Sequence, residues 1–289
     1  MLLPWLDLPH ARQRLAAWSD RTGLDLLRLG SSATADEVRD TAVAQPLLTA
    51  VALLSADAVT GGELPAAVCG HSVGELSALA LAGVLTSDEA VSLAATRGAA
   101  MAAAAKARPT GMSAVLGGDP EQVLAAIELA GLRIATVNVA GQVVVGGDRA
   151  ALDAFAASPP PRARVRALDV AGAFHTPAMA AATVALEQAI GQLKPGPPRC
   201  TVVANADGAV VGDGAELLGR LVGQLTGPVR FDLCLAALAG LGITAAVELA
   251  PGGTLAGLAK RALPAATVVA VKAQDDVRAA RALRTSVPA

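Results

Sequence analysis

Short runs of apolar residues alternate along this chain with longer segments in which apolar residues recur at helical spacing. The short runs predict strands over 66–69, 201–204, 245–249 and 268–271, and the longer segments predict helices such as 217–225 and 231–241. Strands that alternate with helices indicate an α/β protein built on a mostly parallel sheet.

Polar residues at fixed spacing indicate where several helices begin. Two threonines lie three residues before a glutamate, which is the spacing of a capping box: Thr34 before Glu37, and Thr86 before Glu89. Gln45-Pro46 predicts a further helix start, with proline at the first helical position, where its missing N–H is tolerated. Helical patterns also cover 11–18 and 24–29, whereas the segment from Arg278 onward predicts a frayed or weakly helical end.

The middle of the chain has a different pattern, with shorter elements. The predicted order is strand 112–116, helix 120–130, strands 133–139 and 142–145, helix 149–157 and strand 162–170. This β-α-β-β-α-β order is typical of a ferredoxin-like unit. We therefore expect a small ferredoxin-like subdomain over 112–167, inserted in a large subdomain that comprises 1–111 and 168–289.

Composition excludes several classes of function. The chain has 289 residues, of which 53% are hydrophobic and 2% aromatic, and its net charge is −2. It therefore lacks the basic surface and the aromatic platform of a nucleic-acid-binding protein. We find no uninterrupted apolar run of membrane-spanning length and no secretory signal at the N-terminus. Three scattered cysteines indicate free thiols in a reducing compartment, without a metal site, so we expect a cytoplasmic protein that binds neither nucleic acid nor membrane.

One short segment carries a chemical motif. Gly70-His71-Ser72-Val73-Gly74 fits G-x-S-x-G and lies between a predicted strand and a predicted helix. In that setting the motif forms a nucleophile elbow, in which the serine hydroxyl points out of a sharp turn. The backbone N–H of Val73, at the start of the helix, is then well placed to stabilise an oxyanion.

A serine nucleophile needs a base, and the chain has three histidines. His71 lies inside the elbow, where its side chain leaves the backbone in another direction, and His10 lies in a polar N-terminal region. His175 follows the serine at a distance, in the chain order of the α/β hydrolases, so we expect it to be the general base and acid.

The group that orients the histidine stays open on the residues alone. Four aspartates lie between the serine and the histidine: Asp119, Asp148, Asp153 and Asp169. The loop of Ala250, Pro251 and Gly252 could instead offer a backbone carbonyl, which would also fix the tautomer of the imidazole.

Arg97 lies in the middle of a helical pattern of alanine and glycine. A long cation among small residues is either a surface side chain whose stem covers apolar area, or a bidentate clamp for a carboxylate. Spacing alone favours neither reading.

These motifs together resemble a known family. The matching segments are Gln45-Pro46, Gly70 to Glu75, Thr96-Arg97-Gly98, Gly141-Gln142, Gly172 to His175, Asn205 to Gly208, and the Pro251 loop that leads into Lys260-Arg261. The chain resembles the malonyl-CoA:acyl-carrier-protein transacylases of bacterial type II fatty-acid synthesis, and the related acyltransferase domains of polyketide synthases. The resemblance implies an α/β-hydrolase-like large subdomain with a ferredoxin-like insert.

The resemblance also implies an activity and its residues. Ser72 would accept a malonyl group from malonyl-CoA and pass it to the phosphopantetheine thiol of acyl carrier protein in a ping-pong reaction, with His175 as base. Arg97 would pair with the free carboxylate, and Phe174 would disfavour an α-methyl group. Gln45 and His71 would line the substrate site.

Further implications concern the histidine and the partners. In this family a backbone carbonyl orients the histidine, which points to Glu248 or Ala250. No cofactor is needed, since malonyl-CoA is a substrate, and a monomer is the family's usual state. Basic residues could form a docking rim for the acidic carrier protein: Arg162, Arg164, Arg166, Arg199, Lys260 and Arg261.

The chain departs from the family at its N-terminus. Family members begin with a strand and a P-G-Q-G-S-Q loop that supplies a second oxyanion donor, and this motif is absent here. We therefore expect the first strand and loop of the large subdomain to be missing, at a cost of about a hundredfold or more in rate. Two alternatives remain: a serine esterase or thioesterase on the same elbow, and an inactive carrier-protein binder.

Overall fold

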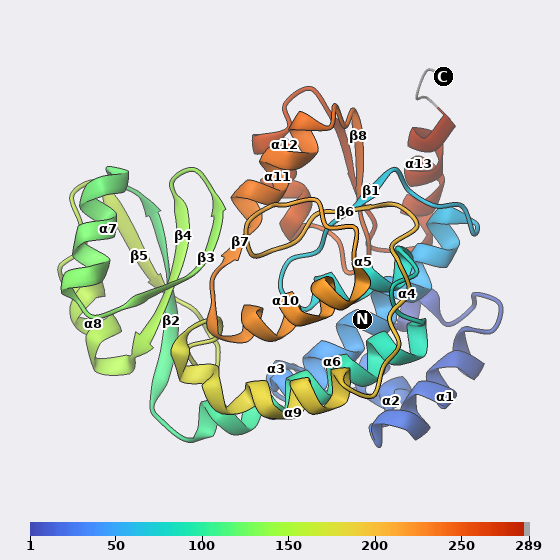
Figure 1. The fold of residues 1–289 in the computed structure, drawn as a ribbon, viewed down its shortest axis with the longest axis horizontal. Helices are drawn as coiled ribbons and strands as arrows, with labels where there is room; N and C mark the ends of the chain where they lie inside the picture. Colours follow the sequence, from blue (N-terminus) through green and yellow to red (C-terminus); the bar gives the residue numbers. More distant parts are fainter. Residues whose placement is uncertain (286–289) are drawn as a thin grey trace.

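The protein is a mixed α/β molecule with a helical body and a five-stranded sheet at one end (Figure 1). The structure is a computed structural model that describes residues 1–285. The first part of the body consists of η1 (Leu3–Trp5), α1 (Ala11–Thr22), α2 (Leu26–Ser31), α3 (Ala35–Arg39), α4 (Thr41–Thr60), β1 (Ala67–Val68), α5 (Gly74–Leu81) and α6 (Ser87–Lys106). Both predicted capping boxes are present, at the starts of α3 and α6.

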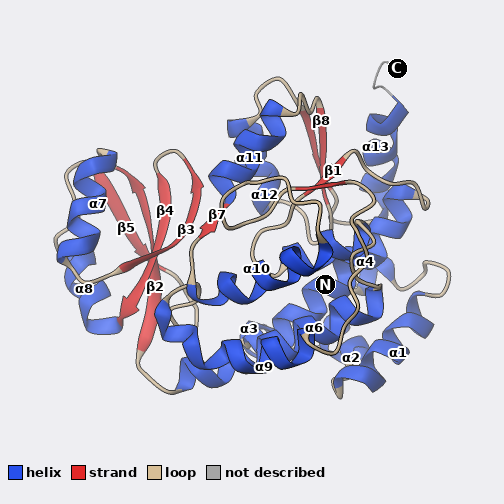
Figure 2. Ribbon diagram, in the orientation of Figure 1, coloured by secondary structure: helices blue, strands red, loops and turns tan. Residues whose placement is uncertain are grey.

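The five-stranded sheet follows α6. Its elements are β2 (Thr110–Gly117), α7 (Pro120–Leu129), β3 (Arg133–Val139), β4 (Gln142–Asp148), α8 (Arg149–Ala157) and β5 (Ala163–Ala167). The strand order is β5-β2-β4-β3, with the short strand β7 (Val229–Arg230) added beside β3. Helices α7 and α8 cover the outer face (Figure 2), where Val123, Ile127 and Phe155 pack on the sheet.

The chain then returns to the body. Its elements are η2 (Pro177–Met179), α9 (Ala180–Ile190), β6 (Thr201–Val202), α10 (Gly214–Thr226), α11 (Phe231–Gly240), β8 (Ala245–Glu248), α12 (Thr254–Ala262), β9 (Thr267–Ala270) and α13 (Gln274–Thr285). Strand β1 pairs with β6 and β8 pairs with β9, both in parallel. The expected mostly parallel sheet is thus limited to two short pairs, because the largest sheet is antiparallel apart from β7.

Two predicted helix boundaries are wrong. Helix α4 begins at Thr41, because the Asp40 side chain accepts a hydrogen bond from the N–H of Ala42 and caps the helix there; Pro46 lies inside it. At the other end, we predicted a frayed or weakly helical segment from Arg278, and the frayed alternative is wrong, because α13 continues to Thr285. Arg281 donates to the carbonyl of Ala58 and ties this helix to the body.

Helix α4 has the length and apolar composition of a membrane-spanning helix, which differs from our expectation of no such run. Most of it is buried inside the protein, where Leu47, Val51 and Leu54 join the main hydrophobic core. A core helix passes the same test of length and composition, so this feature is weak evidence for a membrane.

Candidate active site

The predicted elbow is present between β1 and α5. Ser72 has a φ of 54°, in the left-handed region that a non-glycine residue rarely adopts. Its N–H donates to Oδ1 of Asn205 at 2.8 Å, which helps to hold the turn. A side chain at Gly70 would overlap the backbone of Gly74, so only glycine fits where the strand and the helix approach. The N–H of Val73 has no hydrogen-bond partner within residues 1–285.

The serine meets its predicted base. Oγ of Ser72 lies 2.7 Å from Nε2 of His175, which is buried in the segment between β5 and η2. The other ring nitrogen, Nδ1, lies 2.7 Å from the backbone carbonyl oxygen of Gln224. A carbonyl only accepts, so Nδ1 carries the proton and Nε2 is free to take the hydroxyl proton.

The carbonyl that orients His175 therefore belongs to Gln224, and our assignment to Glu248 or Ala250 is wrong. Gln224 lies in the last turn of α10, where the helix leaves carbonyl groups unpaired. The Glu248 carbonyl accepts from Val271 within the β8–β9 pairing, and its carboxylate caps the start of α12. Ala250 donates to the Ser55 hydroxyl.

The four aspartates do not orient the base either. Asp119 caps α7, Asp148 pairs with Arg108, and Asp169 pairs with Arg39. Asp153 is exposed on α8.

Arg97 is buried beside the nucleophile, which excludes the surface reading. Its side chain on α6 is 1% exposed, and Nη2 lies 3.2 Å from Oγ of Ser72. Nη1 donates to Oε1 of Gln45 at 2.5 Å, and Nη2 donates to Oε1 of Gln224 at 2.7 Å. Nε has no partner in the described part of the chain. Burial lowers the pKa of Arg97 to about 10, so the guanidinium stays charged at neutral pH.

His71 and Phe174 both contact the five-stranded sheet. His71 Nε2 lies 2.9 Å from Oδ1 of Asn138 on β3, and its ring meets the edge of Phe231. Nε2 of His71 therefore points to the five-stranded sheet, as expected for a residue that is not the base. Phe174 precedes His175 and packs against the small apolar cluster of the sheet that includes Met112 and Val144.

The surroundings keep the base neutral. Burial, followed by the charge of Arg97, lowers the pKa of His175 from 6.5 to about 3, although the hydrogen bond to Gln224 raises it. Burial also lowers the pKa of His71. A neutral imidazole is the form that accepts a proton, so His175 is ready to act as base at neutral pH.

Three further residues complete the site: Glu75, Asn205 and Gln224. Glu75 and Asn205 lie in segments that the sequence singled out for other reasons, the end of the elbow motif and the turn after β6. Gln224 had no sequence signal, because a backbone carbonyl at a helix end can come from any residue type.

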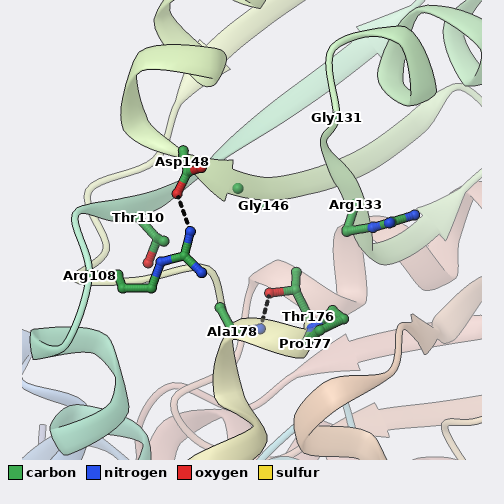
Figure 3. Close-up of a pocket in the computed structure, with 10 residues that line it drawn as sticks. Arg108, Thr110, Gly131, Arg133, Gly146, Asp148, Thr176, Pro177 and Ala178 are labelled. Atoms are coloured by element: carbon green, nitrogen blue, oxygen red, sulfur yellow. Dashed lines mark hydrogen bonds and ion pairs between the residues drawn. The ribbon is translucent and has the colours of Figure 1, made fainter.

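A separate pocket is lined by Thr176, the residue that follows His175 (Figure 3). Its volume is about 250 Å³, and Arg108 pairs with Asp148 on its wall. Ser72 and Arg97 do not line it, so it is distinct from the catalytic group. Within residues 1–285 no cluster of three or more histidine, cysteine or acidic residues could hold a metal ion.

A strained serine on an elbow, a neutral histidine held by a carbonyl, and a buried arginine define a serine acyl-transfer enzyme. A model of the acyl transferase domain family matches residues 12–287, and the chain belongs to this family. It is 50% identical to the malonyl CoA-acyl carrier protein transacylase of Mycolicibacterium smegmatis, over 96% of this chain and 98% of the relative. The namesake from Escherichia coli is 33% identical, over 94% and 91% of the two chains.

Solved structures agree with this. The crystal structure of MCAT from Mycobacterium tuberculosis has a TM-score of 0.94 at 48% identity, covering 97% of this chain and 94% of that one. A malonyl-transacylase in complex with a type II polyketide acyl-carrier protein has a TM-score of 0.89 at 29% identity, covering 98% and 94%.

Proposed function

We propose that this protein transfers a malonyl group from malonyl-CoA to the phosphopantetheine thiol of acyl carrier protein, through an ester on Ser72. The observation that carries the proposal is the position of Arg97, a buried cation that lies 3.2 Å from the nucleophilic oxygen and whose Nε–H has no partner within residues 1–285. A fixed guanidinium at that place can bind the free carboxylate of a malonyl group while its thioester carbon faces Ser72. An esterase for neutral acyl groups has no use for such a cation.

Each half of the reaction moves one proton through His175. In the first half, Nε2 takes the hydroxyl proton as Ser72 attacks the thioester carbonyl, and the N–H of Val73 stabilises the oxyanion. Nε2 then gives the proton to the departing CoA thiolate. In the second half, Nε2 takes the proton of the carrier thiol, which attacks the serine ester, and returns it to Ser72 as the ester bond breaks.

The six basic residues suggested for carrier docking do not form one patch. Arg164 and Arg166 lie on β5, the outer edge of the sheet, whereas Lys260 and Arg261 end α12, near the opposite edge. We propose docking at the α12 end, because Arg261 reaches Gln142 at 2.5 Å and lines a pocket of about 270 Å³ with Val139, next to the His71 partner Asn138. Arg261→Glu should raise the KM for carrier protein, with Arg199→Glu, exposed at the bend before β6, as the control.

We further propose the division into a large subdomain, 1–111 with 168–289, and a ferredoxin-like insert, 112–167. The β5-β2-β4-β3 order supports it, because this order is that of the ferredoxin-like unit. Expression of 112–167 alone, followed by circular dichroism, tests whether the insert folds independently.

The free cysteines support a cytoplasmic location, and we propose a monomer that needs no cofactor. Sedimentation tests whether the protein is a monomer, and activity after dialysis against a chelator tests whether it needs a cofactor.

Intact mass spectrometry after incubation with malonyl-CoA tests the main proposal. We expect a malonyl adduct on Ser72 that moves to added carrier protein, and no adduct in Ser72→Ala. Release of free malonate at the same rate without carrier protein would instead indicate a thioesterase. Absence of any adduct in the folded protein would favour a carrier-protein binder without activity.

A further inference from the structure

A carboxylate lies buried beneath the nucleophile. Glu75 is three residues after Ser72, in the first turn of α5, and its side chain is 3% exposed. Oε1 accepts from the backbone N–H of Asn205 at 2.8 Å, and Oε2 accepts from Nε2 of Gln224 at 2.6 Å. Burial raises the pKa of Glu75 to about 7, against the effect of these hydrogen bonds. A carboxylate is costly to bury unless hydrogen bonds from its partners replace its lost hydration.

The two partners of Glu75 hold the reactive groups. Asn205 Oδ1 accepts from the N–H of Ser72, and its amide nitrogen donates to the carbonyl of Gly70 on the other side of the elbow. Gln224 acts twice: its backbone carbonyl orients His175, and its side-chain oxygen accepts from Arg97. A single residue, Asn205 or Gln224, thus links each of the three groups, the nucleophile, the base and the cation, to the same carboxylate.

The polarity of this network requires an acceptor at Glu75. Both groups that point at it, the Asn205 N–H and the Gln224 amide nitrogen, are donors, and a carboxylate accepts from both. A glutamine in its place would offer one oxygen and one NH₂ group, so one of the two donors would face another donor. Either the Asn205 turn or the Gln224 side chain would then have to move.

We propose that Glu75 is a positioning residue, whose carboxylate sets Asn205 and Gln224 and through them the geometry of Ser72, His175 and Arg97. It does not contact the substrate. The inference rests on the proposed function only in that Arg97 is taken to bind the malonyl carboxylate. The positioning of Ser72 and His175 is independent of the acyl donor.

The decisive variant is Glu75→Gln, which keeps size and shape and removes the second acceptor. The matched control is Glu128→Gln, which removes the same charge from an exposed position on α7. Displacing catalytic groups by about 1 Å costs on the order of a hundredfold, so we expect Glu75→Gln to lower kcat/KM for malonyl transfer by about that factor. The control should match the unmodified protein, and Glu75→Asp, which keeps an acceptor-only group, should recover part of the loss.

A second measurement separates positioning from stability and from the identity of the substrate. A fluorophosphonate probe reacts with an activated serine whatever the natural acyl donor, and its rate at Ser72 reports the Ser72–His175 geometry. We expect at least a tenfold slower labelling in Glu75→Gln that is folded by circular dichroism. Slow labelling in this variant would support the positioning role even if the unmodified protein proved not to transfer malonyl groups.

Two results would overturn the proposal. One is a folded Glu75→Gln protein whose labelling rate and kcat/KM lie within threefold of the unmodified protein. The other result applies if Glu75→Gln does not fold, and it uses the variant Gln224→Met. This variant keeps the backbone carbonyl but removes the side-chain link to Glu75 and Arg97, so it should raise the KM for malonyl-CoA at least tenfold. An unchanged KM in Gln224→Met would show that the link has no effect on Arg97.

Discussion

At the scale of single residues, the site combines strained and buried groups that would be unfavourable elsewhere. Ser72 and His175 both have positive φ, and Arg97, Glu75 and His175 are nearly inaccessible. Each is held by several hydrogen bonds from different elements, so the strain and burial are tolerated. The arrangement gives a neutral base and a fixed cation on the same hydroxyl oxygen.

Arg97→Gln tests the role of the cation. The shorter neutral side chain removes the charge, so the malonyl carboxylate would lose its cationic partner in a buried site. We therefore expect the rate of acylation by malonyl-CoA to fall by about a hundredfold or more. The rate with acetyl-CoA, which has no carboxylate, should fall much less. Acyl-enzyme formation measured by rapid quench with both thioesters gives the ratio.

A suitable control is Arg133→Gln. Arg133 is exposed on β3 and lines the separate pocket that Thr176 also lines. It should leave both rates unchanged. Equal losses with malonyl-CoA and acetyl-CoA in Arg97→Gln would mean that Arg97 supports the fold of the site and does not select the carboxylate.

At the scale of elements, sequence reasoning succeeded where the signal was local. The elbow motif and the capping boxes of Thr34 and Thr86 depend on a few neighbouring residues, and all were placed correctly. It failed where the cause was distant in the chain. The Gln224 carbonyl is available because α10 ends beside His175, and no pattern within α10 reports that neighbour. Pro46 is an exception to this rule, because its signal is local: Asp40, five residues before Gln45, caps α4, and the proline lies inside the helix instead of at its first position.

The residue after Arg97 is a glycine, Gly98, because α6 packs closely against α4 at this position. It lies in α6 where this helix crosses α4, and a Cβ there would meet the Thr41 carbonyl and, at 3.2 Å, the Cα of Ala42. Gly98→Ala should therefore push the helices apart and lower the free energy of unfolding by about 1–3 kcal/mol. It should also slow acylation, because Arg97 moves with α6. Urea unfolding and the acylation rate measure the two effects.

The matched control is Gly219→Ala in α10, where a Cβ meets nothing within 4 Å. Alanine has the higher helix propensity, so this variant should be more stable by about 0.5–1 kcal/mol. A Gly98→Ala protein as stable as the Gly219→Ala protein would show that the α4–α6 crossing has room to spare.

At the scale of the whole molecule, the active site is the place where the helical body meets the five-stranded sheet. Ser72 and Arg97 come from the body, His175 from the segment that leaves the sheet, and His71 reaches Asn138 on β3. Phe174 lies in the apolar contact between the two parts. The relative placement of the parts therefore sets the geometry of the site, and the stability of the whole fold bears on activity.

The buried titratable groups make the fold sensitive to acid. His175 and His71 have pKa values below 6.5 in the folded protein, so below about pH 6.5 the unfolded chain binds protons that the folded protein does not. Stability therefore falls as the pH drops through this range. Glu75 acts in the opposite sense between pH 7 and 4.5, because its raised pKa favours proton uptake by the folded protein. The contributions of His175 and Glu75 nearly cancel between about pH 4.5 and 6.5, so the lowered pKa of His71 decides the net sign, and stability falls as the pH drops.

Urea unfolding at pH 7.5 and at pH 5.5 measures this loss, and the expected result is a clearly lower midpoint at pH 5.5. His71→Gln removes one of the two histidine contributions, so the remaining histidine and Glu75 should nearly cancel and the midpoint should change little with pH. Glu75→Gln should do the reverse and steepen the pH dependence, because both histidines then act without compensation. A midpoint that does not depend on pH in all three proteins would mean that the buried histidines become protonated without unfolding. The lowered pKa inferred for His175 would then be wrong, and the imidazole would act as base at pH 7.5 but be largely protonated at pH 5.5.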